Sequence, residues 1–64
     1  MIKVGDRVIA TENISGVFFT RIPQGTRGVV VEDQSGWFTL RYRVDFDNGE
    51  SESCSEKQIA KINR

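Results

Sequence analysis

The sequence predicts an all-β protein in which five short strands close into a small barrel. Apolar and polar residues alternate through most of the chain, which is the spacing of half-buried strands. A length of 64 residues allows a single hydrophobic core, so we expect one domain over residues 1–64. Residue types that favour the start of a helix occur near the end of the chain, where they predict one short 3₁₀ or α turn before the last strand.

The first half of the chain contains two expected strands and a long connection between them. Residues 4–10 begin with a Gly-Asp bend and continue as a strand. The connection, residues 12–24, contains the only proline and an apolar cluster. The second strand, residues 25–32, contains three consecutive valines, a β-branched run typical of a strand that is buried on both faces or sharply bent.

The third strand, residues 38–46, is the clearest element, because five apolar side chains alternate in it at strict period two. The Asp-Asn-Gly sequence at 47–49 favours a tight type I′ hairpin turn. The returning strand, residues 50–54, is polar on both faces and should lie at an edge of the sheet. Ser55 and Gln58 have the spacing of a capping box, so a helical turn should precede a closing strand at 59–62.

The alternation also predicts the core, through the apolar side chains that it places on inward faces. These are Val4, Val8, Val29, Val31, Leu40, Tyr42, Val44, Phe46, Ile59 and Ile62. A core of about ten such side chains leaves a thin margin over the cost of ordering the chain. A bound partner or self-association would therefore add stability.

This element order resembles that of SH3-like barrels, and short motifs support the resemblance along nearly the whole chain. They are Val4-Gly5-Asp6-Arg7-Val8, Gly25-x-x-Gly28-x-Val30, Tyr42-x-Val44-x-Phe46-Asp47 and Ile59-x-x-Ile62. Similar barrels include the β-subunit domain of nitrile hydratase, the variable chain of ferredoxin–thioredoxin reductase, the PsaE subunit of photosystem I and KOW-type domains. In nitrile hydratase the catalytic metal and cysteines belong to the other subunit. The resemblance therefore implies a supporting role.

The type II dihydrofolate reductases are a similar family in which the small barrel is itself an enzyme. The chain resembles them at Gly5-Asp6-Arg7-Val8 and again over residues 59–63. Their substrate-binding Val-Gln-Ile-Tyr segment would fall on residues 51–54, where none of the four residues matches. The resemblance therefore extends to the fold, and the activity does not follow from it.

The residue inventory argues against catalysis. The chain contains no histidine and one cysteine, which excludes a histidine-based triad, a closed Cys/His zinc site and an intrachain disulfide. We expect Cys54 to be a structural thiol, and we expect no enzyme activity, no metal and no cofactor. No apolar run is long enough to cross a membrane, and the residues after Met1 do not form an export signal, so we expect a cytoplasmic location.

Three large aromatic residues are expected on loops. Phe18 and Phe19 lie in the long connection, and Trp37 lies just before the third strand. Exposed aromatic rings on loops are typical of a contact surface, since they bury a large area with little loss of entropy. The alternative is that one of the phenylalanines folds inward over an open end of the barrel while Trp37 lies across the hairpin.

Arginines could complete such a surface. Arg41 and Arg43 should share the outward side of the third strand, and Arg21 lies in the long connection. Aromatic rings interleaved with arginines suit single-stranded nucleic acid. However, the formal net charge is zero, and residues 45–56 contain five acids and no base. A solvated face with cross-strand ion pairs explains the arginines equally well, and a charged edge strand or a basic partner explains the acids.

These observations predict a non-catalytic binding module or small accessory subunit that acts through protein–protein interaction. Its expected contact residues are Phe18, Phe19, Trp37, Arg21, Arg41 and Arg43. The partner is expected to be another protein. A nucleic-acid-binding module of the KOW or SH3-like kind is the alternative, and a homo-oligomeric enzyme is the third reading.

Overall fold

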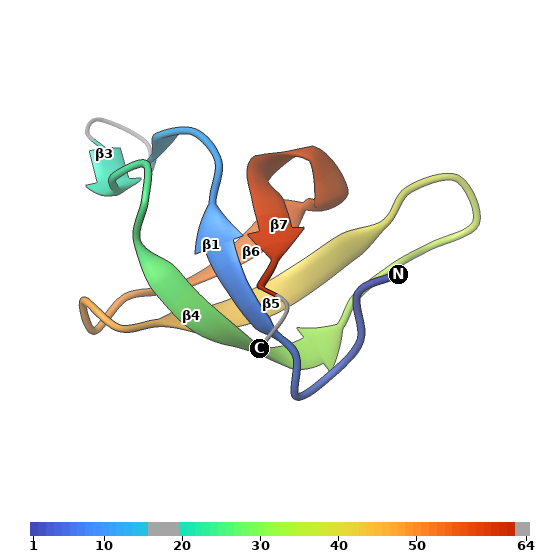
Figure 1. Cartoon of the computed structure of the whole chain (residues 1–64). Helices are drawn as coiled ribbons and strands as arrows, with labels where there is room; N and C mark the ends of the chain where they lie inside the picture. Colours follow the sequence, from blue (N-terminus) through green and yellow to red (C-terminus); the bar gives the residue numbers. More distant parts are fainter. Residues whose placement is uncertain (16–19, 63–64) are drawn as a thin grey trace.

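The computed structural model describes residues 1–15 and 20–62 (Figure 1). In these residues the chain forms seven strands and one 3₁₀ turn. They are β1 (Arg7–Ala10), β2 (Ile14–Ser15), β3 (Thr20–Ile22), β4 (Arg27–Asp33), β5 (Arg41–Phe46), β6 (Ser51–Ser55), η1 (Glu56–Gln58) and β7 (Ile59–Lys61). The predicted all-β class is confirmed, and so is the helical turn before the last strand.

Five of the strands form one antiparallel sheet in the order β6-β5-β4-β1-β7. β2 and β3 pair only with each other, within the segment expected as one long connection. In the described part of the chain, β6 and β7 are the two ends of the larger sheet. The pairing of the strands therefore does not close the sheet into the predicted barrel. The described residues also form seven strands, two more than the five predicted.

Strand β4 contains a bulge that changes which valines face the core. Val30 lies opposite Val44 of β5, whereas the next pair in the ladder is Glu32 with Arg43. Val31 is thus the extra residue of a β-bulge. Gly28 and Val30 face inward, and Gly28 is so close to β5 that a Cβ atom there would lie 2.6 Å from the carbonyl oxygen of Asp45.

The phase of β4 explains two of the five residues that were wrongly predicted to be in the core. Val29 is only partly buried and Val31 is exposed, because their neighbours take the inward positions. Val4 and Leu40 are also exposed, and Ile62 is partly buried, because all three lie outside the strands. The buried core consists of Val8, Ala10, Ile14, Ile22, Val30, Tyr42, Val44, Phe46, Cys54 and Ile59. Half of these were predicted, namely Val8, Tyr42, Val44, Phe46 and Ile59.

The strand starts also differ from the prediction. β1 begins at Arg7, because Gly5 has a positive φ of 96° and donates its amide to the carbonyl of Val30. β5 begins at Arg41, because residues 36–39 form a turn. In both places, apolar residues that continue the alternation in the sequence lie in turns or loops instead.

The β5–β6 turn is tight, but it is not of the predicted type I′. Gly49 has a φ of 91°, whereas no other residue type in the described chain has a positive φ, so Asn48 does not supply the second one. The amide of Gly49 donates to the carbonyl of Phe46, and the amide of Phe46 donates to that of Glu50. This is the pattern of a type I turn followed by a glycine in the left-handed region.

The predicted capping box at η1 is confirmed. The Ser55 hydroxyl accepts a hydrogen bond from the amide of Lys57, and the amide of Ser55 donates to Oε1 of Gln58. This cap fixes the direction in which the chain leaves β6 and turns into β7. It thereby positions η1 beside the start of β5, where the amide of Glu56 donates to the carbonyl of Leu40.

Candidate functional site

The connection between β4 and β5, residues 34–40, is here called the aromatic loop. Its base is held by several hydrogen bonds. The amide of Ser35 donates to Oδ1 of Asp33 at 2.9 Å, and the Ser35 hydroxyl accepts from the amide of Arg41 at 3.1 Å. The amide of Gln34 donates to the carbonyl of Arg41 at 2.9 Å. Hydrogen bonds from Ser35 also lower the pKa of Asp33. The loop therefore leaves the sheet in a defined direction.

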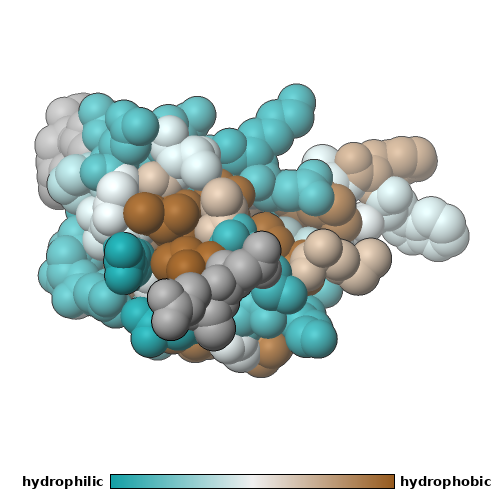
Figure 2. Space-filling view, viewed as in Figure 1, coloured by the Kyte–Doolittle hydropathy of each residue, from teal (hydrophilic) through white to brown (hydrophobic). Residues whose placement is uncertain are grey.

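Two aromatic residues occupy the tip of the aromatic loop. The amide of Gly36 donates to the carbonyl of Thr39 at 3.0 Å, which leaves Trp37 and Phe38 as the two central residues of the turn. The two residues are 95% and 96% exposed. In Figure 1 the loop projects from one side of the sheet, and Figure 2 shows apolar side chains projecting on that side of the molecule.

An open groove of about 400 Å³ lies between the aromatic loop and η1. One wall is formed by the arm of the loop that leads into β5, with Phe38 and Leu40 as its apolar residues. The opposite wall is formed by the end of β6 and by η1. The full set of lining residues is Phe38, Thr39, Leu40, Arg41, Ser55, Glu56 and Lys57. The groove thus combines apolar surface with two basic groups and one acidic group.

Arg41 and Arg43 lie on the outer face of β5, as their alternation with buried Tyr42 and Val44 requires. Arg41 borders the groove and donates to Ser53, from Nε to the hydroxyl at 3.3 Å and from Nη2 to the carbonyl at 3.0 Å. Arg43 is exposed, with Glu32 and Ser53 opposite it in the sheet. Arg41 is therefore held in place beside the aromatic loop.

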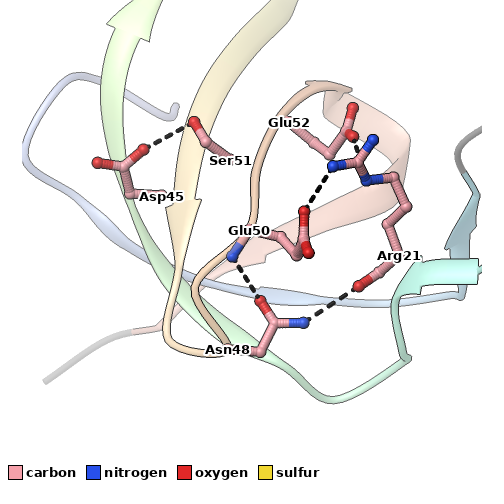
Figure 3. Close-up of polar contacts among 6 residues, drawn as sticks. All are labelled: Arg21, Asp45, Asn48, Glu50, Ser51 and Glu52. Carbon is pink, nitrogen blue, oxygen red and sulfur yellow. Dashed lines mark hydrogen bonds and ion pairs between the residues drawn. The ribbon is translucent and has the colours of Figure 1, made fainter.

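Arg21 comes from β3, and its side chain points toward Glu50 and Glu52 at the start of β6 (Figure 3). Its guanidinium contacts Glu50 at 2.6 Å and Glu52 at 3.1 Å. Glu52 shares its face with buried Val44, which lies directly opposite it on β5. The hydrogen bond with Glu50, followed by the charges of both glutamates, raises the pKa of Arg21. The contacts tie β3 to β6.

Asn48 adds a second link between the same two parts of the chain. Its side-chain amide donates to the carbonyl of Arg21 at 3.1 Å, and its Oδ1 accepts from the amide of Glu50 at 3.1 Å (Figure 3). Two of the five acids in the stretch expected either to charge an edge or to meet a basic partner, Glu50 and Glu52, therefore contact a basic residue of their own chain.

We expect Arg21→Met to lower the thermal stability of the chain by a few degrees, because it leaves two neighbouring glutamates without their shared cation. Arg43→Met is the matched control, since that side chain is exposed on the outer face, and it should change the melting temperature less. Thermal unfolding followed by circular dichroism, in low and high salt, measures both. Equal effects of the two substitutions would show that the Arg21 contacts contribute nothing specific.

Of the other predicted residues, Phe18 and Phe19 lie outside the described residues. Cys54 is buried and unpaired, and burial, followed by the charge of Glu52, raises the pKa of its thiol to about 11. The thiol is therefore neutral near pH 7, which suits the structural role predicted for it. No three His, Cys, Asp or Glu side chains gather as a metal site within residues 1–15 and 20–62.

Part of this surface was not predicted from the sequence. The alternation in the sequence places Leu40 on the inward face of a strand, with Phe38 in phase with it, and gives no sign that Glu56 and Lys57 of η1 lie beside them. The signal available was the Asp33-Gln34-Ser35-Gly36 sequence, whose residues hydrogen-bond their own backbone and favour turns. The turn extends as far as Thr39, so it takes up the first two residues, 38 and 39, of the strand that the alternation predicts.

Among the residues that the structure describes, no helix has the length and apolar character needed to cross a membrane. Comparison of the chain with protein-family models, with curated proteins and with solved structures gave no match.

Proposed function

We propose that this chain is a non-catalytic binding module or small accessory subunit that acts through protein–protein contact. The docking surface consists of the aromatic loop and the groove beside η1, and the partner is another protein. Trp37 and Phe38 are the anchors, and Arg41 orients the partner. A cytoplasmic location is part of the proposal, because an unpaired cysteine suits a reducing compartment.

The observation that carries the proposal is the exposure of two adjacent aromatic side chains at the tip of a tied loop. Turn centres usually hold glycine, asparagine, aspartate or serine, which are compatible with water. Here Trp37 and Phe38 are almost fully exposed, and a groove of mixed apolar and charged surface adjoins them. Because hydrogen bonds already hold the base of the loop, little entropy is lost when the rings are covered. Tryptophan is also among the residues that contribute most to protein interfaces.

We also propose that the strands are arranged as an SH3-like barrel. The support is the order β6-β5-β4-β1-β7, the tight β5–β6 turn and the 3₁₀ turn before β7. In addition, Ile14 of β2 and Ile22 of β3 belong to the same core as the larger sheet. The β2–β3 hairpin would then cover the core beside β6, where Arg21 and Asn48 link the two parts.

Selection of a random peptide library against the immobilised chain tests the docking surface. We expect recovered peptides to shift amide resonances in residues 36–41 and 55–57. They should bind Trp37→Ala at least about tenfold more weakly, the loss typical of an interface anchor. Arg43→Ala is the control, because Arg43 is exposed but does not line the groove, and it should bind as the unmodified chain does. Binding that is independent of Trp37 would argue against this surface.

Nucleic-acid binding is the second candidate, favoured by the exposed Arg43 on the same outer face as Arg41. It ranks lower because Glu32 lies opposite Arg43 and Arg21 is engaged by two glutamates. A titration with mixed single-stranded and duplex oligonucleotides at low salt separates the candidates. Amide shifts at Trp37, Arg41 and Arg43 that disappear at high salt would favour nucleic acid, and an unchanged spectrum would favour protein.

A further inference from the structure

We propose that the aromatic loop and the groove form a two-fold interface between two copies of this chain, in which Trp37 of each copy enters the groove of the other. The inference rests on the proposed function, since it assigns a specific partner to the same docking surface. It adds that the partner is a second copy and that each groove is completed by a residue of the other chain.

The shape of the surface is the first argument. A two-fold interface uses the same patch on both copies, so that patch must contain both a projection and a recess. Trp37 projects into solvent, whereas the groove beside it is lined by other residues, beginning with its neighbour Phe38. The groove volume of about 400 Å³ is near the lower end of the range for ligand sites, which suits an inserted side chain.

The charges of the groove are the second argument. Its walls carry Arg41 and Lys57 together with Glu56, so the patch contains both signs of charge. A two-fold axis can bring Glu56 of one copy toward a basic group of the other, and the same contact then occurs twice. The formal net charge of the whole chain is zero, so two copies approach without long-range repulsion.

The buried area sets the expected strength. An aromatic side chain can bury roughly 150–250 Å². Two rings from each copy therefore give an interface near the lower size class, below about 1,200 Å² in total, where complexes are weak and reversible. A core of ten residues in a chain of 64 is small, and a dimer buries further apolar surface. We therefore expect monomer and dimer to exchange with concentration.

Sedimentation of the full chain from micromolar to millimolar concentration tests the assembly. The unmodified chain should convert from monomer to dimer, and Trp37→Ala should weaken dimer formation at least about tenfold, as loss of an anchor does. Because Trp37 is exposed, this substitution should leave the fold unchanged. Val31→Thr is the matched control, since it alters an exposed apolar residue outside the groove and should leave the dimer unchanged.

Two further measurements test the geometry. In an equimolar mixture of isotope-labelled and unlabelled chains, intermolecular nuclear Overhauser effects should connect the Trp37 indole with the Leu40 methyl groups. Glu56→Lys should weaken its own homodimer, because the three charged positions of the patch then all carry positive charge. Lys57→Glu reverses the net charge of the same patch from +1 to −1. A mixture of the two variants should restore association, since their patches then carry opposite charge.

The outcomes distinguish this inference from the proposed function. A chain that stays monomeric at millimolar concentration with a solvated Trp37 overturns the dimer and leaves the surface available for a different protein. A dimer that persists in Trp37→Ala, or that lacks the Trp37–Leu40 contact, uses another face and also overturns the inference. A Trp37 that is shielded from solvent in the dilute monomer contradicts both proposals.

Discussion

Gly28→Ala should be one of the most destabilising single substitutions in this chain, with an expected loss of about 2–3 kcal/mol in the free energy of unfolding. An added Cβ atom would lie 2.6 Å from the carbonyl oxygen of Asp45, 2.9 Å from Cγ1 of Val44 and 3.0 Å from Cα of Phe46. Two of these three atoms belong to the backbone of β5, so they cannot move without disturbing the β4–β5 ladder.

Gly36→Ala is the matched control for this prediction. At Gly36 the nearest atom to an added Cβ is the hydroxyl oxygen of Thr39 at 3.8 Å, which is an ordinary contact. The control should therefore change stability by no more than about 0.5 kcal/mol. Urea unfolding followed by far-ultraviolet circular dichroism compares the two variants. Equal midpoints would mean that β4 and β5 are not as close at Gly28 as the structure shows.

Ile22→Ala should cost about 2–4 kcal/mol, as expected for removing most of a fully buried isoleucine side chain. Ile22 lies on β3, outside the five-stranded sheet, yet none of its surface is exposed. The loss would therefore show that the β2–β3 hairpin is part of the one core. This is the feature on which the proposed barrel depends, because the hairpin would cover the core beside β6.

Ile9→Ala removes the same atoms from a site that is only partly buried, on the other face of β1 from Val8 and Ala10. It should cost clearly less than Ile22→Ala, since less apolar surface is lost from the core. The same urea unfolding experiment measures both variants. If the two substitutions have equal effects, the hairpin does not contribute to the core in the way proposed here.

The strands could be predicted from the sequence where alternation and turn chemistry agree. In β5 the buried residues Tyr42, Val44 and Phe46 follow strict alternation, and the neighbouring Asn-Gly marks the turn. The capping box at Ser55 could be predicted equally well, because its hydrogen bonds join residues only two or three positions apart. Local patterns of this kind need no information about the rest of the fold.

The β4 valines could not be assigned in the same way. A run of three β-branched residues contains no alternation, so either phase fits the sequence. The actual phase is set by the approach of β5 to Gly28 and by the bulge at Val31, and both depend on the partner strand. The strands β2 and β3 are short and pair only with each other, so they left little periodic signal.

The candidate site could be predicted only in part, because it too depends on contacts between distant parts of the chain. Trp37 stood out as a large aromatic residue next to turn residues, and Arg41 followed from the alternation of β5. Arg21 is separated from them because tertiary packing directs it toward Glu50 and Glu52. The groove itself joins two segments more than ten residues apart, and sequence spacing does not reveal such a contact.

The central claim is that the aromatic loop presents Trp37 to solvent until a partner covers it. Trp37 is the only tryptophan, so its intrinsic fluorescence reports on this one position. In a dilute, monomeric sample we predict an emission maximum typical of a solvated indole and efficient quenching by acrylamide, with no change in Gly36→Ala. Blue-shifted emission and weak quenching in that sample would contradict the account, because the indole would then already be buried within its own chain.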